Sequence, residues 1–230
     1  MKKLVAALAA IGALGLANTA SAADLPMKAP LMPVAVPYNW TGIYIGATFG
    51  GVWGDWSYTN PAAAFNSATN RVSGVLGGPT LGFNWQTGAW VFGVEGDWSW
   101  SNAKATDLSG CSAPGCETDY RWFATVRGRV GYAFDHFLLY VTGGGAFARN
   151  EQTFLPTGAD NGRANIGGWT FGGGVEWAFW QNWSVKAEYL HMDFGDQTIF
   201  NPAIALNIVH HDKNLNIARV GLNYRFNWMQ

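Results

Sequence analysis

The feature that most constrains this chain is a two-residue period of apolar side chains that runs from Trp40 almost to the C-terminus. In residues 41–52 the odd positions are mostly apolar, as at Ile43 and Phe49, and the even positions from 42 to 50 are Gly, Tyr or Thr. Successive side chains of a strand point to opposite faces, so this period predicts a strand with two different faces. The pattern predicts eight strands, in 41–52, 74–85, 92–100, 121–132, 137–147, 169–179, 184–189 and 219–226.

The composition of the two faces predicts which one points inward. One face carries mainly Gly, Ser, Thr and a few charges, whereas the other is crowded with aromatic residues, since the chain has 13 Trp and 14 Phe. That number is more than one small core would hold, so the apolar face is expected to meet lipid. An open strand edge in hydrocarbon would leave backbone groups unsatisfied, so the strands are expected to close into an all-β, eight-stranded antiparallel transmembrane barrel.

Aromatic residues also gather where the predicted strands end. Outer-membrane barrels carry girdles of aromatic residues at both lipid–water interfaces. The predicted girdle residues are Trp40, Trp53, Trp56, Trp85, Trp90, Trp100, Trp177, Trp180 and Trp183.

The overall composition excludes several other classes. Only 13% of residues are charged, about half the usual fraction for a soluble domain. A formal net charge of −1 leaves no electrostatic footprint for nucleic acid, so no nucleic-acid partner is expected. Beyond the first twenty-odd residues no run of about 18 apolar residues occurs, which excludes a helical membrane span.

The N-terminal segment predicts export. Lys2 and Lys3 precede an apolar stretch, and Ala20-Ser21-Ala22 has the small residues of a cleavage site. We therefore expect a signal peptide in 1–22, a Pro-rich periplasmic leader in 23–39 and the barrel in 40–230. The leader's four prolines favour an extended linker, with a docking peptide for a partner as the alternative.

The predicted connections alternate in length. Short links fall in 86–89, 133–136 and 180–182, and long ones in 57–71, 101–118, 150–163 and 195–213. Bacterial barrels have short periplasmic turns and long external loops, so both termini are expected in the periplasm. Pro79 lacks the N–H donor of a ladder position, and the adjacent Gly77 and Gly78 suggest a bulge there.

Charged residues on the predicted inward face are nearly balanced in sign. Glu95 and Asp97 lie on the strand next to the one that bears Arg127 and Arg129, so cross-strand ion pairs are geometrically available. We expect a salt-bridge network that closes the lumen, with a conducting or proton-relay role as the alternative. The network residues are Glu95, Asp97, Arg127, Arg129, Glu176, Lys186, Glu188, Arg219 and Arg225.

The cysteines and histidines suggest no metal site or cofactor. Cys111 and Cys116 lie in a predicted external loop, where an oxidising exterior favours a disulfide; metal ligation is the alternative. None of the four histidines belongs to a spaced metal motif. The adjacent His210 and His211 could hold a haem iron, although an ordinary polar loop explains them as well.

The chain resembles a known family over nearly the whole of its predicted mature length. The segments NWTGIYIG (39–46), GFNWQ (82–86), GVEGD (93–97), VRGRVGY (126–132), VKAEY (185–189) and RVGLNYRF (219–226) look like those of the alphaproteobacterial outer-membrane immunogenic proteins, a porin-like group of small surface antigens. Members are described as structural antigens, porins or haemin binders. In such barrels the last strand usually ends at its aromatic residue, but here four residues follow Phe226, so either Phe226 or Trp228 is the assembly signal.

Together these patterns predict a protein of the cell outer membrane with a structural and surface-interaction role and no enzymatic activity. The alternatives are a small passive pore, a haem-binding surface receptor and a lipid-modifying enzyme. The location implies contacts with outer-membrane lipids, with lipopolysaccharide and with the barrel assembly machinery. The oligomeric state stays open.

Overall fold

The computed structural model describes residues 38–60, 65–66, 70–107, 116–154, 159–201 and 206–226. Its strands are β1 (Gly42–Asn60), β2 (Phe65–Asn66), β3 (Asn70–Thr87), β4 (Trp90–Asp107), β5 (Cys116–Phe134), β6 (Phe137–Phe154), β7 (Ala159–Ala178), β8 (Trp183–Asp193), β9 (Gly195–Asn201) and β10 (Leu206–Phe226). Across these ranges, no helix has the length and apolarity to cross a membrane.

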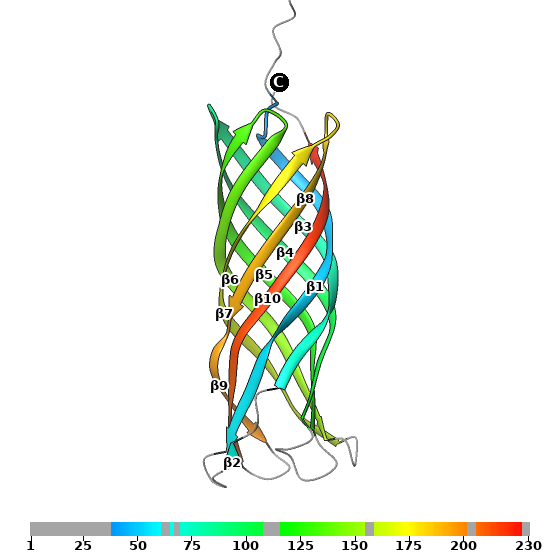
Figure 1. The fold of residues 1–230 in the computed structure, drawn as a ribbon, viewed down its shortest axis with the longest axis vertical. Coiled ribbons are helices and arrows are strands. Elements are labelled where there is room, and N and C mark those ends of the chain that lie inside the picture. The colour runs from blue at the N-terminus through cyan, green and yellow to red at the C-terminus, as the bar shows by residue number, and fades with distance from the viewer. Residues whose placement is uncertain are drawn as a thin grey trace, which may run out of the picture. The chain divides into compact units, whose positions relative to one another are not determined.

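The strands form one closed antiparallel sheet. The eight long strands of the wall pair in order, and β10 returns to pair with β1, which closes the wall (Figure 1). The short β2 continues β3 along the end of β1, and β9 continues β8 along β10. The barrel wall therefore has eight positions, and the predicted eight-stranded fold is confirmed.

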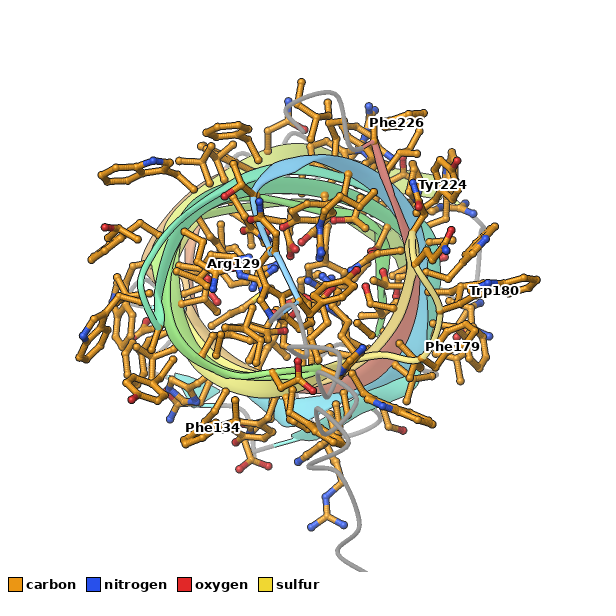
Figure 2. All side chains as sticks on the ribbon, turned by 90° about the horizontal axis from the view of Figure 1, so that it is seen from above. Arg129, Phe134, Phe179, Trp180, Tyr224 and Phe226 are labelled. Atoms are coloured by element: carbon orange, nitrogen blue, oxygen red, sulfur yellow. The ribbon has the colours of Figure 1, made fainter. Side chains whose placement is uncertain are left out.

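The two faces of the wall are assigned as the alternation predicts. Val126 is 66% exposed on the outer face, whereas its neighbour Thr125 is 1% exposed in the lumen. Figure 2 shows Phe134 and Trp180 directed away from the barrel, while Arg129 lies among the side chains that fill it. The apolar surface thus faces outward, as lipid contact requires.

The strands extend further than predicted at one end. The turns at 88–89, 135–136 and 179–182 mark the turn end of the barrel, and the opposite end is here called the loop end. At the loop end β4 continues to Asp107 and β10 begins at Leu206, inside segments that were expected to be loops. Apolar alternation fades there, because the outer face of these hairpin extensions is expected to lie beyond the lipid, while backbone pairing continues.

Pro79 lies within β3 and does not create the expected bulge. It is aligned with Ala47 of β1, and the pairing of β3 with β4 skips Gly78 and Pro79 but resumes in the same register. Proline has no N–H to donate, so the ladder is interrupted without a shift. The register shifts in the described pairs lie near the loop end instead, for example between Tyr120 and Trp122.

Three layers of side chains fill the lumen. The inward residues of β10 show the order, with Arg225 nearest the turn end, Arg219 in the middle and Leu215 toward the loop end. A small apolar cluster therefore fills the turn end, charged residues fill the middle, and a larger apolar cluster fills the loop-end half. Sequence analysis predicted only the charged layer.

Candidate functional site

The centre of the lumen charge network is Arg127 on β5. Its guanidinium forms ion pairs with Glu95, with Asp97 at 2.9 Å and with Glu188 at 3.0 Å, and its Nε donates to the Thr125 hydroxyl at 2.9 Å. The Arg127 side chain is fully buried. Glu95 stands opposite Arg127 across the β4–β5 ladder, as expected, but Glu188 reaches it across the lumen from β8.

Two further cations, Arg219 and Lys186, complete the middle layer. The Arg219 guanidinium on β10 donates to Asp97 and to Glu188, each at 2.7 Å. The Lys186 ammonium on β8 donates to Glu95 Oε2 at 2.7 Å. Each of these three carboxylates therefore contacts at least two cations. The free-energy cost of removing its charge from water is offset by short charge-assisted hydrogen bonds.

Nearer the turn end, Arg129 pairs with Glu176 rather than mainly with its neighbour Glu95. The Arg129–Glu176 contact is 2.8 Å, whereas the nearest Arg129–Glu95 atoms are 3.6 Å apart. The guanidinium also lies 4.0 Å from the ring centroid of Tyr140, a cation–π geometry. Glu176 in addition accepts the Ser184 hydroxyl at 2.6 Å.

Inward glycines make room for these long cations. A Cβ atom at Gly221 would lie 3.1 Å from Cε of Lys186, and one at Gly93 would lie 3.0 Å from Cγ of Arg129. At these two positions a glycine therefore leaves space for a long charged side chain from a neighbouring strand. All nine predicted network residues are buried in the lumen, five cations with four carboxylates.

The turn end is closed by the segment that precedes β1, here called the turn-side cap (Tyr38–Trp40). The Trp40 backbone N–H donates to Gln86 Oε1 at 2.6 Å, and its indole N–H donates to the Asp135 carbonyl at 3.1 Å. The Tyr38 hydroxyl donates to the Gln181 carbonyl at 3.2 Å. These three partners belong to three different hairpins, so the cap ties the whole mouth together.

The prediction that Trp40 belongs to the aromatic girdle is wrong. Its side chain is 0% exposed and lies within the mouth of the barrel, where the Arg225 guanidinium sits 4.6 Å from its ring. Arg225 also donates to the Tyr38 hydroxyl at 2.9 Å. The period-two pattern begins only after Trp40, because this residue precedes β1 and is directed inward by the cap.

Two titratable groups of the cap region are perturbed. The pKa of the Asp135 carboxyl is lowered, first by its hydrogen bond with the His136 ring at 2.6 Å and then by the Tyr38 backbone N–H. Burial is the main cause that raises the pKa of the Tyr38 hydroxyl. Asp135 is therefore a charged anchor of the cap at neutral pH.

The loop-side apolar layer closes the other half of the lumen. Phe123 packs between Tyr120, at a ring-centroid distance of 5.7 Å, and Phe194, at 6.5 Å. The layer is formed by Val52, Val72, Leu76, Ala103, Tyr120, Phe123, Ala146, Ala148, Ile166, Leu190, Met192, Phe194, Leu215 and Ile217. The signal was present in the sequence, because Leu190 and Met192 continue the inward phase of Glu188.

The remaining predicted site residues are two cysteines and two histidines. His210 and His211 lie on β10, paired with β1 and β9, rather than in a loop. Cys111 is outside the described residues, as is the side chain of Cys116, so the predicted disulfide is not addressed. In the described part of the chain, no group of three or more His, Cys, Asp or Glu is placed to hold a metal ion.

Comparisons with known proteins agree with this architecture. The outer membrane protein beta-barrel domain family matches residues 6–226. The 31 kDa outer-membrane immunogenic protein of Brucella melitensis is 35% identical over 98% of this chain and 100% of its own length. The 25 kDa outer-membrane immunogenic protein of Brucella abortus is 31% identical over 98% of this chain and 99% of its own length.

A solved structure shares the fold. The outer membrane protein OprG from Pseudomonas aeruginosa aligns with a TM-score of 0.50 and 14% identity, covering 81% of this chain and 97% of its own. At this level of identity the likeness concerns the barrel alone.

Proposed function

Because this chain belongs to the outer membrane protein beta-barrel domain family, together with the alphaproteobacterial outer-membrane immunogenic proteins, we propose that it is a closed, non-conducting barrel that displays hairpins at the cell surface. Its location is the cell outer membrane. The function is structural and antigen-like. The turn end faces the periplasm in this proposal, and the loop end faces outward.

The observation that carries the proposal is the position of Arg127. Its guanidinium contacts three carboxylates from two sides of the lumen, between one apolar cluster at the turn end and another toward the loop end. An ion would have to separate these buried pairs and also cross both apolar clusters. Eight strands leave an interior only wide enough for side chains, which supports closure.

The antigen-like part is the set of hairpins at the loop end. There the strands of the wall continue past the aromatic girdle, as β4 does to Asp107 and β6 to Phe154. The relatives named above are called immunogenic, which supports surface exposure. Lipopolysaccharide is the proposed partner in the outer leaflet, and the assembly machinery is the proposed partner during insertion.

The proposal includes no catalytic step. The Ser184 hydroxyl donates to Glu176 and the Arg127 and Arg219 guanidinium groups are held by carboxylates, so these groups serve one another rather than a substrate. For the assembly signal we propose Phe226, which is 45% exposed at the end of β10. Trp228 lies outside the described residues.

Planar-bilayer recording of the refolded mature protein tests closure. The unmodified barrel is expected to show no steady conductance. A variant that combines Glu95→Ala and Asp97→Ala with Phe123→Ala and Leu190→Ala removes two of the four lumen carboxylates and breaches the loop-side apolar layer. The five lumen cations are then in excess, so the variant should show an anion-selective leak. A large steady conductance in the unmodified protein would refute the closed-barrel proposal in favour of a passive pore.

A further inference from the structure

Outside the lumen, the wall formed by β4, β5, β6 and β7 carries cations next to an aromatic groove. The register places Trp98, Ala124, Phe147 and Gly167 in one outward row across these strands. The next row toward the loop end holds Trp100, Trp122, Arg149 and Asn165, and beyond it Lys104, Asp119 and Glu151 lie side by side. Polarity therefore changes from apolar to charged along this wall.

The apolar part of the wall is hollowed into what we call the outer aromatic groove. Its volume is about 570 Å³, and Trp98, Trp122, Phe147 and Gly167 line it. The Trp98 and Trp122 rings are stacked at 4.3 Å between centroids, and Phe147 is 49% exposed. A Cβ atom at Gly167 would meet only the Phe147 ring, at 3.8 Å, so the floor of the groove is open.

A register shift brings an additional arginine to the charged rows. Arg121 is the extra residue between Tyr120 and Trp122, where β5 slips relative to β6, and β-bulges commonly re-aim side chains in this way. Its side chain is 58% exposed and contacts Glu151 at 2.9 Å. Arg149, directly opposite Trp122, contacts Glu151 at 3.3 Å and is 36% exposed.

The charge of this wall differs from that of the opposite wall at the same end. With Lys104, the β4–β6 rows hold three cations and two carboxylates, Asp119 and Glu151. On the other side of the barrel the outward positions of β8, β10 and β1 at the loop end are Asp193, Asn214 and Asp55. Among these described outward positions, cations therefore occur only on the wall that also carries the outer aromatic groove.

We propose that this wall is a binding site for lipopolysaccharide, with phosphate groups of its lipid A headgroup on Arg121 and Arg149 and an acyl chain in the outer aromatic groove. The proposal rests on the outward orientation of the loop end in the proposed function. Guanidinium groups stay protonated and bind phosphate through two parallel hydrogen bonds. Phosphate would replace the contacts that Arg121 and Arg149 each make with Glu151 through Nε. Aromatic residues at the interface level supply the apolar contact below.

The spread of the cations favours a phosphorylated glycolipid over a phospholipid. Lys104, Arg121 and Arg149 lie on three neighbouring strands, which places them across roughly 10 Å of wall. A headgroup with a single phosphodiester can engage only part of that width. A sugar headgroup with more than one phosphate can engage it all, and sugar faces also pack on exposed Trp rings.

Titration of the refolded, full mature protein in detergent micelles, followed by native mass spectrometry, tests the site. The probes are bisphosphorylated lipid A, monophosphoryl lipid A and phosphatidylglycerol. We expect one lipid A per barrel, with affinity falling in that order. Arg121→Gln with Arg149→Gln should weaken lipid A binding at least tenfold, whereas Arg71→Gln, an exposed arginine on β3, should leave it unchanged.

Glu151→Gln provides a test in the opposite direction. It removes the carboxylate that competes for both arginines, so lipid A should bind several-fold more tightly. Equal affinity of the unmodified protein and the double arginine variant would overturn the site, and so would binding of phosphatidylglycerol as tight as that of lipid A. Each variant is first checked for heat-modifiable gel mobility. The double arginine variant should show no steady conductance in planar bilayers. A failure of lipid A binding can therefore be told apart from a failure of the closed-barrel proposal.

Discussion

Arg127 on β5 and Glu95 on β4 stand directly opposite each other in the strand register, and their buried side chains form an ion pair inside the lumen. The same guanidinium holds Glu188, which lies on a strand that is not a neighbour of β5. One arginine therefore ties opposite parts of the barrel wall together. This arrangement makes the lumen charge network a structural element, and its removal has a measurable cost.

Glu95→Ala with Asp97→Ala should destabilise the barrel by about 3–5 kcal/mol, because the variant leaves buried cations without their partners. Urea unfolding in lipid vesicles measures the loss. The added substitution Arg127→Met should restore part of the stability, since it removes a cation that has lost two of its three carboxylate partners. No recovery in the triple variant would contradict the pairing. Without a breach of the loop-side apolar layer, the double variant should stay closed in bilayers.

Val126→Arg should cost about 2–4 kcal/mol, because Val126 faces lipid near the middle of β5. Val130→Arg, closer to the turn-end girdle, should cost less, since the penalty falls to about 0–1 kcal/mol near the interfaces. Vesicle unfolding compares the two. Equal penalties would mean that the lipid midplane does not lie at Val126.

Thr125→Arg is not a neutral inward control, although the alternation alone suggests crowding as its only effect. The Thr125 hydroxyl donates to Asp97 at 2.8 Å and accepts from Arg127. An arginine there would place a further cation beside Arg127 and Arg219. We expect a loss of stability in the same unfolding assay that is at least as large as that of Val126→Arg.

Trp40→Ala should destabilise the barrel by about 3–5 kcal/mol, as expected for loss of a buried Trp. Trp180→Ala is the matched control, because Trp180 is 68% exposed at the same end of the barrel. Acrylamide quenching should also show one protected tryptophan that is lost in Trp40→Ala. If the two variants unfold at the same urea concentration, the turn-side cap does not stabilise the mouth.

The turn-side cap should weaken in acid. The hydrogen bond with His136 is the first cause that lowers the pKa of Asp135. A carboxyl with a depressed folded-state pKa contributes stability above its ordinary pKa of about 3.9, and that contribution is lost as the pH falls through the lower folded-state value. Asp135→Asn should therefore be less stable than the unmodified protein at pH 7, and the difference should shrink below about pH 4. A difference that stays constant over this range would exclude Asp135 as the titrating group.

Haemin titration should give no saturable Soret shift with the unmodified protein. His210 and His211 are consecutive residues of β10, and successive positions of a strand belong to opposite faces, so we expect no iron site from this pair within one chain. A saturable shift that disappears in His210→Ala with His211→Ala would make haem capture a function of this hairpin. A shift that survives would move the site elsewhere, with His191 as the next candidate.

Much of the fold followed from local pattern. The alternation predicted both faces of the wall, and the inward charges placed Glu95 and Arg127 on adjacent strands without fixing their register; the structure sets them directly opposite each other. The alternation was less informative at the loop end, where strands such as β10 extend through segments expected to be loops. There the outer face is expected to lie beyond the lipid and need not be apolar, so the two-residue period no longer distinguishes a paired strand from a loop.

The sequence by itself determined the period, the lipid-facing surface and closure of the sheet, because each depends only on neighbouring residues and on the cost of unpaired backbone in lipid. Only the tertiary structure decided that Arg219 on β10 meets Asp97 on β4, and that Trp40 lies inside the mouth. These contacts join strands that are not paired with each other. Curvature of the closed wall brings them together across the lumen, and no local pattern contains that curvature.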